Sequence, residues 1–205
     1  MPRTVDHEER RSMILKAFMA VAAREGLHAV SLRAVAAEAG ISLRSVQYYF
    51  DTKAGLMQAG LAALEKLSNE RVRTRLEALE PSPSARTTLQ ALFAVALPTD
   101  RESRRFHLLW TSYAMLAMTD PEISDRTFVD SPNRLQERIA FILEEGKSSG
   151  EFDGALNGEL EATILISLIH GLGTAVLVGQ QTSESATSSF EHYLDRLAGA
   201  KSGNG

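Results

Sequence analysis

Residues 31–53 read SLRAVAAEAGISLRSVQYYFDTK, and this stretch predicts two short helices joined by a tight turn, followed by the start of a third helix. Apolar residues recur from Leu32 to Ala39 at the spacing of one helix face. Gly40 follows where that helix must end, at a position that often needs a left-handed backbone. Two short helices joined by such a turn form a helix-turn-helix, whose second helix enters the major groove of DNA.

The second helix of this motif has two different sides. Val46 and Phe50 lie four residues apart and predict its inner, buried side. Its outer side carries hydrogen-bonding, aliphatic and flat side chains, namely Leu43, Arg44, Ser45, Gln47 and Tyr48. We expect this outer side to touch base edges. The helix-turn-helix would then comprise about residues 31–50, with its second helix as the recognition helix.

Three successive helix starts each pair a hydroxyl cap with a cation: Ser31 with Arg33, Ser42 with Arg44, and Thr52 with Lys53. A cation in a first turn opposes the helix dipole by about 0.3 to 1 kcal/mol, whereas an anion there is bound by the dipole and by free N–H groups. Phosphate is such an anion. For any single cation an ordinary solvated side chain is the better interpretation, but three in one motif favour a phosphate-contacting surface.

Composition and charge are compatible with this interpretation. The 205 residues carry a net charge of −4, which argues against a globally basic nucleic-acid coat. Residues 1–53 nevertheless hold eight Lys and Arg against six Asp and Glu, while the remainder holds fourteen against twenty. The chain has no cysteine, which excludes disulfides and thiolate metal sites, and its first ten residues lack the apolar region of a signal peptide, so we expect a cytoplasmic protein.

The rest of the chain predicts further helices and no strand, so the expected fold class is all-α with about nine helices in all. We expect helices near residues 6–24, 31–39, 42–50, 53–79, 84–96, 101–118, 121–146, 159–179 and 185–198. Pro132 should kink or divide the seventh, and GKSSGEFDG at 146–154 should be a loop. We expect residues 1–52 to bind DNA and residues 53–205 to bind an effector and to dimerise.

Residues 6–56 resemble the DNA-binding domain of the tetracycline-repressor (TetR) family of regulators. SLRAVAAEAGISLRSVQYYFDTKAGL is similar to that family's capped helix, Ala-Gly turn, short reading helix ending in an aromatic-Phe pair, and Ser/Thr-Lys. The resemblance implies that Tyr49 and Lys53 contact phosphates. Arg44 and Gln47 depart from the family pattern, so base contacts do not carry over. The resemblance implies a homodimeric repressor that binds a palindromic operator in double-stranded DNA and responds to a small-molecule effector.

The helical body offers candidates for an effector pocket. Aromatic, methionine and histidine side chains that could line it are Phe93, Phe106, His107, Trp110, Tyr113, Met115, Met118 and His170. For any single one of these residues core packing is the more common role, and both histidines are more often hydrogen-bonded core residues than ligands. As a set they combine apolar area with a few donors, which is typical of ligand sites. Met115 is the weakest member, because helical spacing places it away from the aromatic face.

The last two long helices are expected to form a two-fold dimer interface. Its candidate contacts are Ile164, Leu168, Gly171, Val176, Phe190 and Leu197. Residues 162–179 carry no formal charge and reach the lower length limit of a membrane span, but three glycines and several polar residues dilute them and no basic flank is present. A core and dimer helix is the better interpretation, so no membrane partner is expected.

No catalytic constellation, metal site or cofactor motif is evident. The five histidines lack zinc-ligand spacing, and Gly171 and Gly173 do not complete a dinucleotide fingerprint, because Val176 stands at the third glycine position. A regulator is therefore the expected function, not an enzyme. The alternatives are a structural DNA-binding protein without an effector and, less favoured, an enzyme that carries a helix-turn-helix. Effector-dependent loss of DNA binding separates the regulator from the structural protein.

Overall fold

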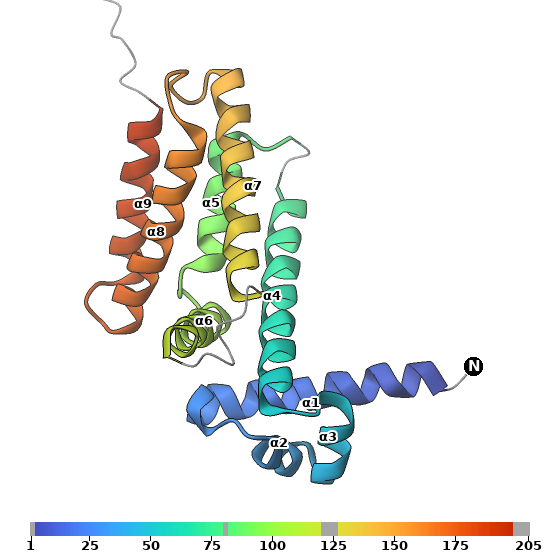
Figure 1. Cartoon of the computed structure of the whole chain (residues 1–205). Coiled ribbons are helices and arrows are strands. Elements are labelled where there is room, and N and C mark those ends of the chain that lie inside the picture. Colours follow the sequence, from blue (N-terminus) through green and yellow to red (C-terminus); the bar gives the residue numbers. More distant parts are fainter. Residues whose placement is uncertain (1–2, 80–81, 120–126, 199–205) are drawn as a thin grey trace, which may run out of the picture. The chain divides into compact units, whose positions relative to one another are not determined.

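The computed structural model describes residues 3–79, 82–119 and 127–198, and all regular structure within these ranges is helical. The predicted all-α fold class is confirmed. The elements in chain order are α1 (Arg3–Glu25), the 3-10 turn η1 (Leu27–Ala29), α2 (Leu32–Ala39), α3 (Leu43–Phe50), α4 (Lys53–Glu77), α5 (Ala85–Ala96), α6 (Arg101–Thr119), α7 (Thr127–Ser149), α8 (Gly158–Leu177) and α9 (Ser183–Leu197) (Figure 1).

The chain forms two compact units. Unit 1 comprises Met1–Leu67 and Leu108–Phe128, and unit 2 comprises Ser68–His107 and Val129–Gly205. Helices α4 and α6 each contribute residues to both units. The boundaries of these compact units differ from the expected boundary between a DNA-binding part and an effector-binding part after residue 52. That functional division stays a prediction.

Unit 1 is built on α1, with α2 and α3 packed on one side of it (Figure 1). The inner side of α1 is apolar, with Ile14, Phe18, Val21 and Ala22 all buried. The Phe18 ring occupies the space that a Cβ on Gly60 of α4 would need. Glycine at this position thus permits the close approach of α1 and α4.

Helices α4 and α6 complete the core of unit 1. Leu56 and Leu64 of α4 are buried, whereas Leu67 is 52% exposed. The Tyr113 hydroxyl of α6 donates a 2.7 Å hydrogen bond to the backbone carbonyl of Met57 in α4. Burial raises the pKa of Tyr113, so this phenol stays protonated and remains a donor.

Unit 2 contains α5, α7, α8 and α9, which lie alongside one another (Figure 1). Its core draws one apolar face from each of these helices. Phe93 of α5 and Phe190 of α9 stack at the centre, with ring centroids 3.7 Å apart and ring planes 6° from parallel. Leu143 of α7 and Leu165 of α8 are buried in the same cluster.

Helix α7 corrects two expectations. It runs without a break from Thr127 to Ser149, so Pro132 does not divide it. Pro132 lies near the amino-terminal end, where few backbone hydrogen bonds are lost to its missing N–H. Residues 146–149 belong to the helix, so the predicted loop begins only at Gly150, whose φ of 77° suits glycine.

Side chains cap the helix starts of unit 2. Ser84 accepts from the Thr87 N–H at the start of α5, and the Glu151 carboxylate accepts from the Ala85 and Arg86 N–H groups at 3.1 Å. Burial alone would raise the pKa of Glu151, but these backbone donors outweigh it and lower that pKa. The loop after α7 is thereby attached to the start of α5.

Candidate DNA-binding surface and regulatory body

Residues 31–50 form the helix-turn-helix that the sequence predicted. Gly40 adopts the left-handed conformation with φ 65° and ψ 30°, and it ends α2. The Ile41 N–H then donates to the Ala36 carbonyl at 3.0 Å, which closes the turn. Val35 and Ala36 of α2 are buried, so α2 holds the turn against the core of unit 1.

The three predicted hydroxyl caps are confirmed. Ser31 Oγ accepts from the Ala34 N–H at 3.1 Å, and Ser42 Oγ accepts from the Ser45 N–H at 3.1 Å. Thr52 Oγ1 accepts from the Gly55 N–H at 3.0 Å. Each cap satisfies one of the unpaired amides of its helix start, and earlier amides of the same turn stay available to an anion.

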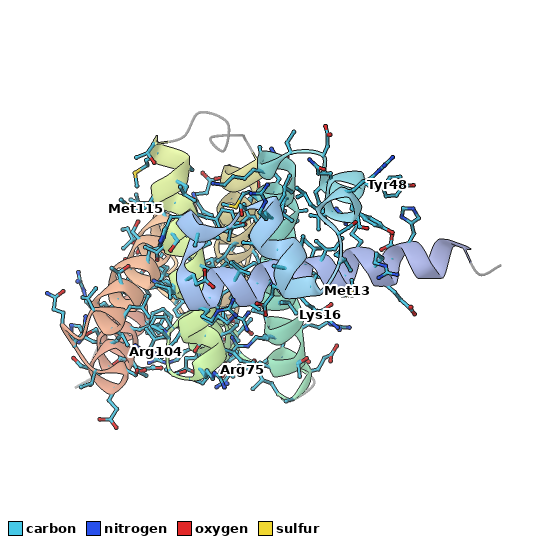
Figure 2. The ribbon with its side chains drawn as sticks, turned by 90° about the horizontal axis from the view of Figure 1, so that it is seen from below. Met13, Lys16, Tyr48, Arg75, Arg104 and Met115 are labelled. Atoms are coloured by element: carbon cyan, nitrogen blue, oxygen red, sulfur yellow. The ribbon has the colours of Figure 1, made fainter. Side chains whose placement is uncertain are left out.

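Helix α3 presents the expected inner and outer sides. Val46 and Phe50 are buried and anchor it. On the outer side Arg44, Gln47 and Tyr48 are exposed, and Tyr48 at 72% is among the most exposed large hydrophobic side chains. Figure 2 shows Tyr48 extending outward from the ribbon.

The remaining residues of the predicted DNA-contacting set surround this side. Arg33, Ser42, Thr52 and Lys53 are exposed, whereas Ser31, Leu43, Ser45 and Tyr49 are half-buried. Ser42 Oγ and Ser45 Oγ lie 2.9 Å apart and hydrogen-bond each other. All these residues belong to unit 1, which therefore presents one cation at each of three capped helix starts beside the recognition helix.

Two residues of α1 lie against α3 although the sequence did not single them out. The Arg11 guanidinium carbon is 5.4 Å from the Phe50 ring centroid, and His7 contacts the tyrosines of α3. The available signal was weak: the four-residue spacing of His7 and Arg11 places them on one helix face but does not show that this face meets α3. We expected a start near Asp6, whereas α1 begins at Arg3.

The predicted effector-pocket residues divide between the two units. Phe93, Phe106, His107 and His170 belong to unit 2, and Trp110, Tyr113, Met115 and Met118 belong to unit 1. Phe106, Trp110 and His170 are half-buried, which leaves them as pocket candidates. The pocket itself stays a prediction.

Three of these residues are corrected by their surroundings. Phe93 is 2% exposed and stacks on Phe190, so its ring is committed to core packing. Met115 and Met118 are 56% and 71% exposed, because they lie on the side of α6 away from its buried residues Leu109 and Tyr113. Figure 2 shows Met115 pointing outward. The predicted aromatic residues of α6 are Phe106, Trp110 and Tyr113, and of these Tyr113 is buried in the core of unit 1.

His107 and His170 both lie in unit 2 and are uncharged near neutral pH. Burial lowers the pKa of His107, and hydrogen bonding to the backbone of Ala96 and His170 opposes part of that effect. Burial, followed by the proximity of His107, lowers the pKa of His170 to about 4. The His107 ring fills the space beside Gly173 of α8, where a Cβ would collide with it. His107 is therefore a core residue of unit 2.

After its first turn, which holds Glu159 and Glu161, helix α8 has a buried side and an exposed side without charge. The exposed side includes Leu160, Ile164 and Gly171, and a Cβ on Gly171 would meet no atom within 4 Å. The helix is long and apolar enough to cross a membrane by length and composition, with 39% of its apolar window buried, which is weak evidence for a span. The same pattern is typical of a helix that packs on a second protein surface.

The candidate dimer contacts need correction in three places. Val176, Phe190 and Leu197 are all buried in the core of this chain, so their side chains do not reach a partner. The sequence showed that these residues are apolar, but it did not show which side of α8 or α9 faces the core. Ile164 and Gly171 are exposed and Leu168 is half-buried, and these three remain candidates.

A shallow depression of about 600 Å³ lies at the junction of α7 and α8. It is bordered by Phe141, Glu144 and Lys147 of α7 and by Asn157, and it contains none of the predicted pocket residues. Lys147 and Glu144 pair across one turn of α7 at 2.9 Å. Among the described residues, no group of three His, Asp or Glu side chains is placed to hold a metal ion.

Comparisons with known proteins match two separate parts of the chain. A family model for bacterial regulatory proteins of the tetR family matches residues 14–59, and a model for the C-terminal part of BetI-type transcriptional repressors matches residues 85–199. The chain is 29% identical over 174 residues to the transcriptional regulator PksA of Bacillus subtilis, covering 84% of this chain and 80% of PksA. It is 26% identical to the regulator BetI of Vibrio atlanticus, covering 96% and 95%.

Solved structures share the fold over nearly the whole chain. A transcriptional regulator from Saccharomonospora viridis in complex with choline is 27% identical with a TM-score of 0.81, covering 92% of this chain and 96% of that one. A TetR-family regulator from Rhodococcus is 22% identical with a TM-score of 0.81, covering 93% and 99%, and it supports the fold alone.

The depressed pKa of His170 predicts a loss of stability in mild acid. The unfolded imidazole takes up a proton below about pH 6.5, whereas the folded one resists until about pH 4, so the free energy of unfolding falls across this window. Between pH 7.5 and 5.5 His170 should contribute a loss of about 1 kcal/mol. Urea unfolding of wild type and His170→Gln at both values measures it. An equal loss in both proteins would contradict the assignment, and His28→Gln is the control at an exposed histidine.

Proposed function

Because this chain belongs to the TetR family of transcriptional regulators and carries a BetI-type carboxy-terminal domain, we propose that it is a homodimeric repressor that binds a palindromic operator and is released by a small molecule. The observation that carries the proposal is the outer side of α3, which is anchored by buried Val46 and Phe50 and presents exposed Arg44, Gln47 and Tyr48. Residues 1–52 would bind DNA, and residues 53–205 would dimerise and bind the effector.

Within the DNA-binding part, base reading and backbone holding fall to different residues. Arg44 and Gln47 are exposed on the recognition helix, and their planar groups suit guanine and adenine edges. Tyr49 and Lys53 lie near the end of α3 and the start of α4, where phosphates would be met. The free amides beside the caps of Ser31, Ser42 and Thr52 would add phosphate contacts.

Dimerisation would use the uncharged outer side of α8. One recognition helix covers only a few base pairs, so specific binding at an operator needs two copies related by a two-fold axis. Ile164, Leu168 and Gly171 lie at one-turn spacing, and the small Gly171 allows close approach of a second helix. Such a partner would remove apolar surface of α8 from water.

The effector is proposed to be a small organic cation of the choline type. The neighbour from Saccharomonospora viridis holds choline, and it shares 27% identity with this chain. Aromatic rings attract quaternary ammonium groups through the negative faces of their π systems. In unit 2, helix α6 offers half-buried Phe106, and buried neutral His107 adds no repelling charge.

Helix α6 is bonded to α4, which starts at the DNA-binding part. In unit 1 Tyr113 donates to the Met57 carbonyl at 2.7 Å, and in unit 2 Arg71 of α4 pairs with Asp100, the residue before α6, at 3.0 Å. A ligand that shifts α6 would therefore act on α4 and on the spacing of the two reading heads. The protein leaves the operator only if the ligand binds the form whose reading heads do not match the operator more tightly than the form whose reading heads do.

The rival functions receive less support. Members of the family are regulators. No residue of this chain has been assigned a catalytic role, which an enzyme carrying a helix-turn-helix would require. A structural DNA-binding protein would not respond to an effector. We infer a cytoplasmic location, where DNA is accessible, and interpret α8 as a dimer helix and not as a membrane span.

Two substitutions distinguish contacts to DNA bases from contacts to DNA phosphates. Lys53→Ala should weaken binding to all DNA sequences and reduce the salt slope by about one, because one phosphate contact is lost. Arg44→Ala should cost about 1 to 3 kcal/mol mainly at one operator position. Titrations of operator variants at several salt concentrations measure both. Equal loss on every sequence for Arg44→Ala would remove it from the base-reading set.

A charge on the outer side of α8 should dissociate the dimer. Ile164→Glu places a carboxylate in the proposed interface, where its desolvation is unfavourable, so sedimentation at micromolar concentration should show a monomer with weakened operator binding. Leu67→Glu, at an exposed apolar residue of α4, is the matched control and should stay dimeric. A monomeric wild type with full operator affinity would disprove the dimer.

Choline should lower operator affinity in the concentration range in which it changes the fluorescence of Trp110, the single tryptophan of the chain. Both signals report one binding event if the ligand lies against α6. Ethanolamine, which lacks the three N-methyl groups of choline, serves as the control, since its primary ammonium is more strongly hydrated. If the fluorescence change saturated with choline while operator affinity stayed the same, choline would not be the effector.

A further inference from the structure

The amino-terminal part of α1 contacts two tyrosines of the recognition helix, exposed Tyr48 and half-buried Tyr49. The His7 ring centroid is 4.8 Å from that of Tyr49 and 5.6 Å from that of Tyr48. His7 Nε2 lies 3.3 Å from the Tyr48 hydroxyl. Tyr48 and Tyr49 pack edge to face, with centroids 5.2 Å apart and ring planes at 88°. All three residues belong to unit 1.

This cluster lies at the surface and not in the core. His7 is exposed, and Tyr48 is 72% exposed, so little burial free energy can come from their contact. Phe50 and Val46 already anchor α3 through buried side chains. Stabilising the fold is therefore a poor explanation for the contact between the exposed His7 and Tyr48, although Tyr49 beside them is half-buried.

A tyrosine that protrudes from a recognition helix loses rotamer freedom when it meets DNA. Ordering one such side chain weakens binding by about two- to tenfold. Contacts with a ring on a neighbouring helix restrict the rotamer before binding and so reduce this cost. Helix α1 continues past α3 toward its amino terminus, which places His7 where it can do this (Figure 1).

We propose that His7 is a positioning residue that holds Tyr48 in the orientation in which it meets operator DNA. His7 acts through its ring contacts with Tyr48 and Tyr49 and not by touching DNA. This inference rests on the proposed operator binding. It extends the DNA-reading surface from the helix-turn-helix to the first turns of α1.

A double-mutant cycle on the full-length protein tests the proposal. Operator affinity is measured by fluorescence anisotropy for wild type, His7→Ala, Tyr48→Ala and the double variant. His7→Ala should bind about two- to tenfold more weakly, which corresponds to the ordering cost of one side chain. In the Tyr48→Ala background the same change should have no further effect. His28→Ala, an exposed histidine of the same unit, should bind as wild type does.

Two further readouts separate positioning from other roles. His7→Phe keeps an aromatic ring and should restore most of the affinity lost in His7→Ala. The salt slope of His7→Ala should equal that of wild type, because no phosphate contact is lost. Thermal unfolding of His7→Ala should match wild type, since His7 is exposed.

Several outcomes would overturn the proposal. Additive losses in the cycle or a salt slope reduced by about one would each mean that His7 contacts DNA itself, and failure of His7→Phe to restore affinity would overturn positioning through ring contacts. Wild-type affinity in His7→Ala would mean that the cluster has no role in binding. Failure of the wild type to retain any DNA sequence would instead disprove the proposed function.

Discussion

The close approach of α1 and α4 at Phe18 and Gly60 is the constraint on which unit 1 depends. The Phe18 ring stands where a Cβ on Gly60 would be, so a larger residue would have to displace a buried aromatic ring. Overpacking of this kind costs about 1 to 3 kcal/mol in well-packed cores. Because α2 and α3 pack on α1, this contact also keeps the start of α4, at Lys53, beside the recognition helix.

The electrostatics of the DNA-binding surface follow from the helix starts. Ser31, Ser42 and Thr52 each satisfy one backbone amide, which leaves other amides and the positive end of the dipole facing outward. Exposed Arg33, Arg44 and Lys53 add charge to the same places. An arrangement that is slightly unfavourable in the free protein thus becomes favourable when phosphate arrives.

The carboxy-terminal part divides its apolar surface by helix side. The inner side of α8 joins the core of unit 2, where Phe93 and Phe190 stack, while its outer side after the first turn is free of formal charge. In the same unit, burial keeps His107 and His170 neutral at physiological pH. Unit 2 therefore contains polar groups that neither attract anions nor repel cations.

The sequence by itself determined the features that depend on neighbours within one or two helical turns. The all-α class, the caps at Ser31, Ser42 and Thr52, the turn at Gly40 and the inner side of α3 all rest on hydrogen bonds and contacts three or four residues apart. Such local spacing is written directly in the chain. The same patterns carried the family resemblance.

Only the tertiary structure decided which apolar residue met which partner. Phe93 and Met118 were both pocket candidates, yet one stacks on Phe190 from α9 and the other is 71% exposed. Phe190 itself proved to be core and not a dimer contact. His7 meets Tyr48, which lies 41 positions further along the chain. Helical periodicity defines a side of a helix, but the packing of distant segments determines what covers that side.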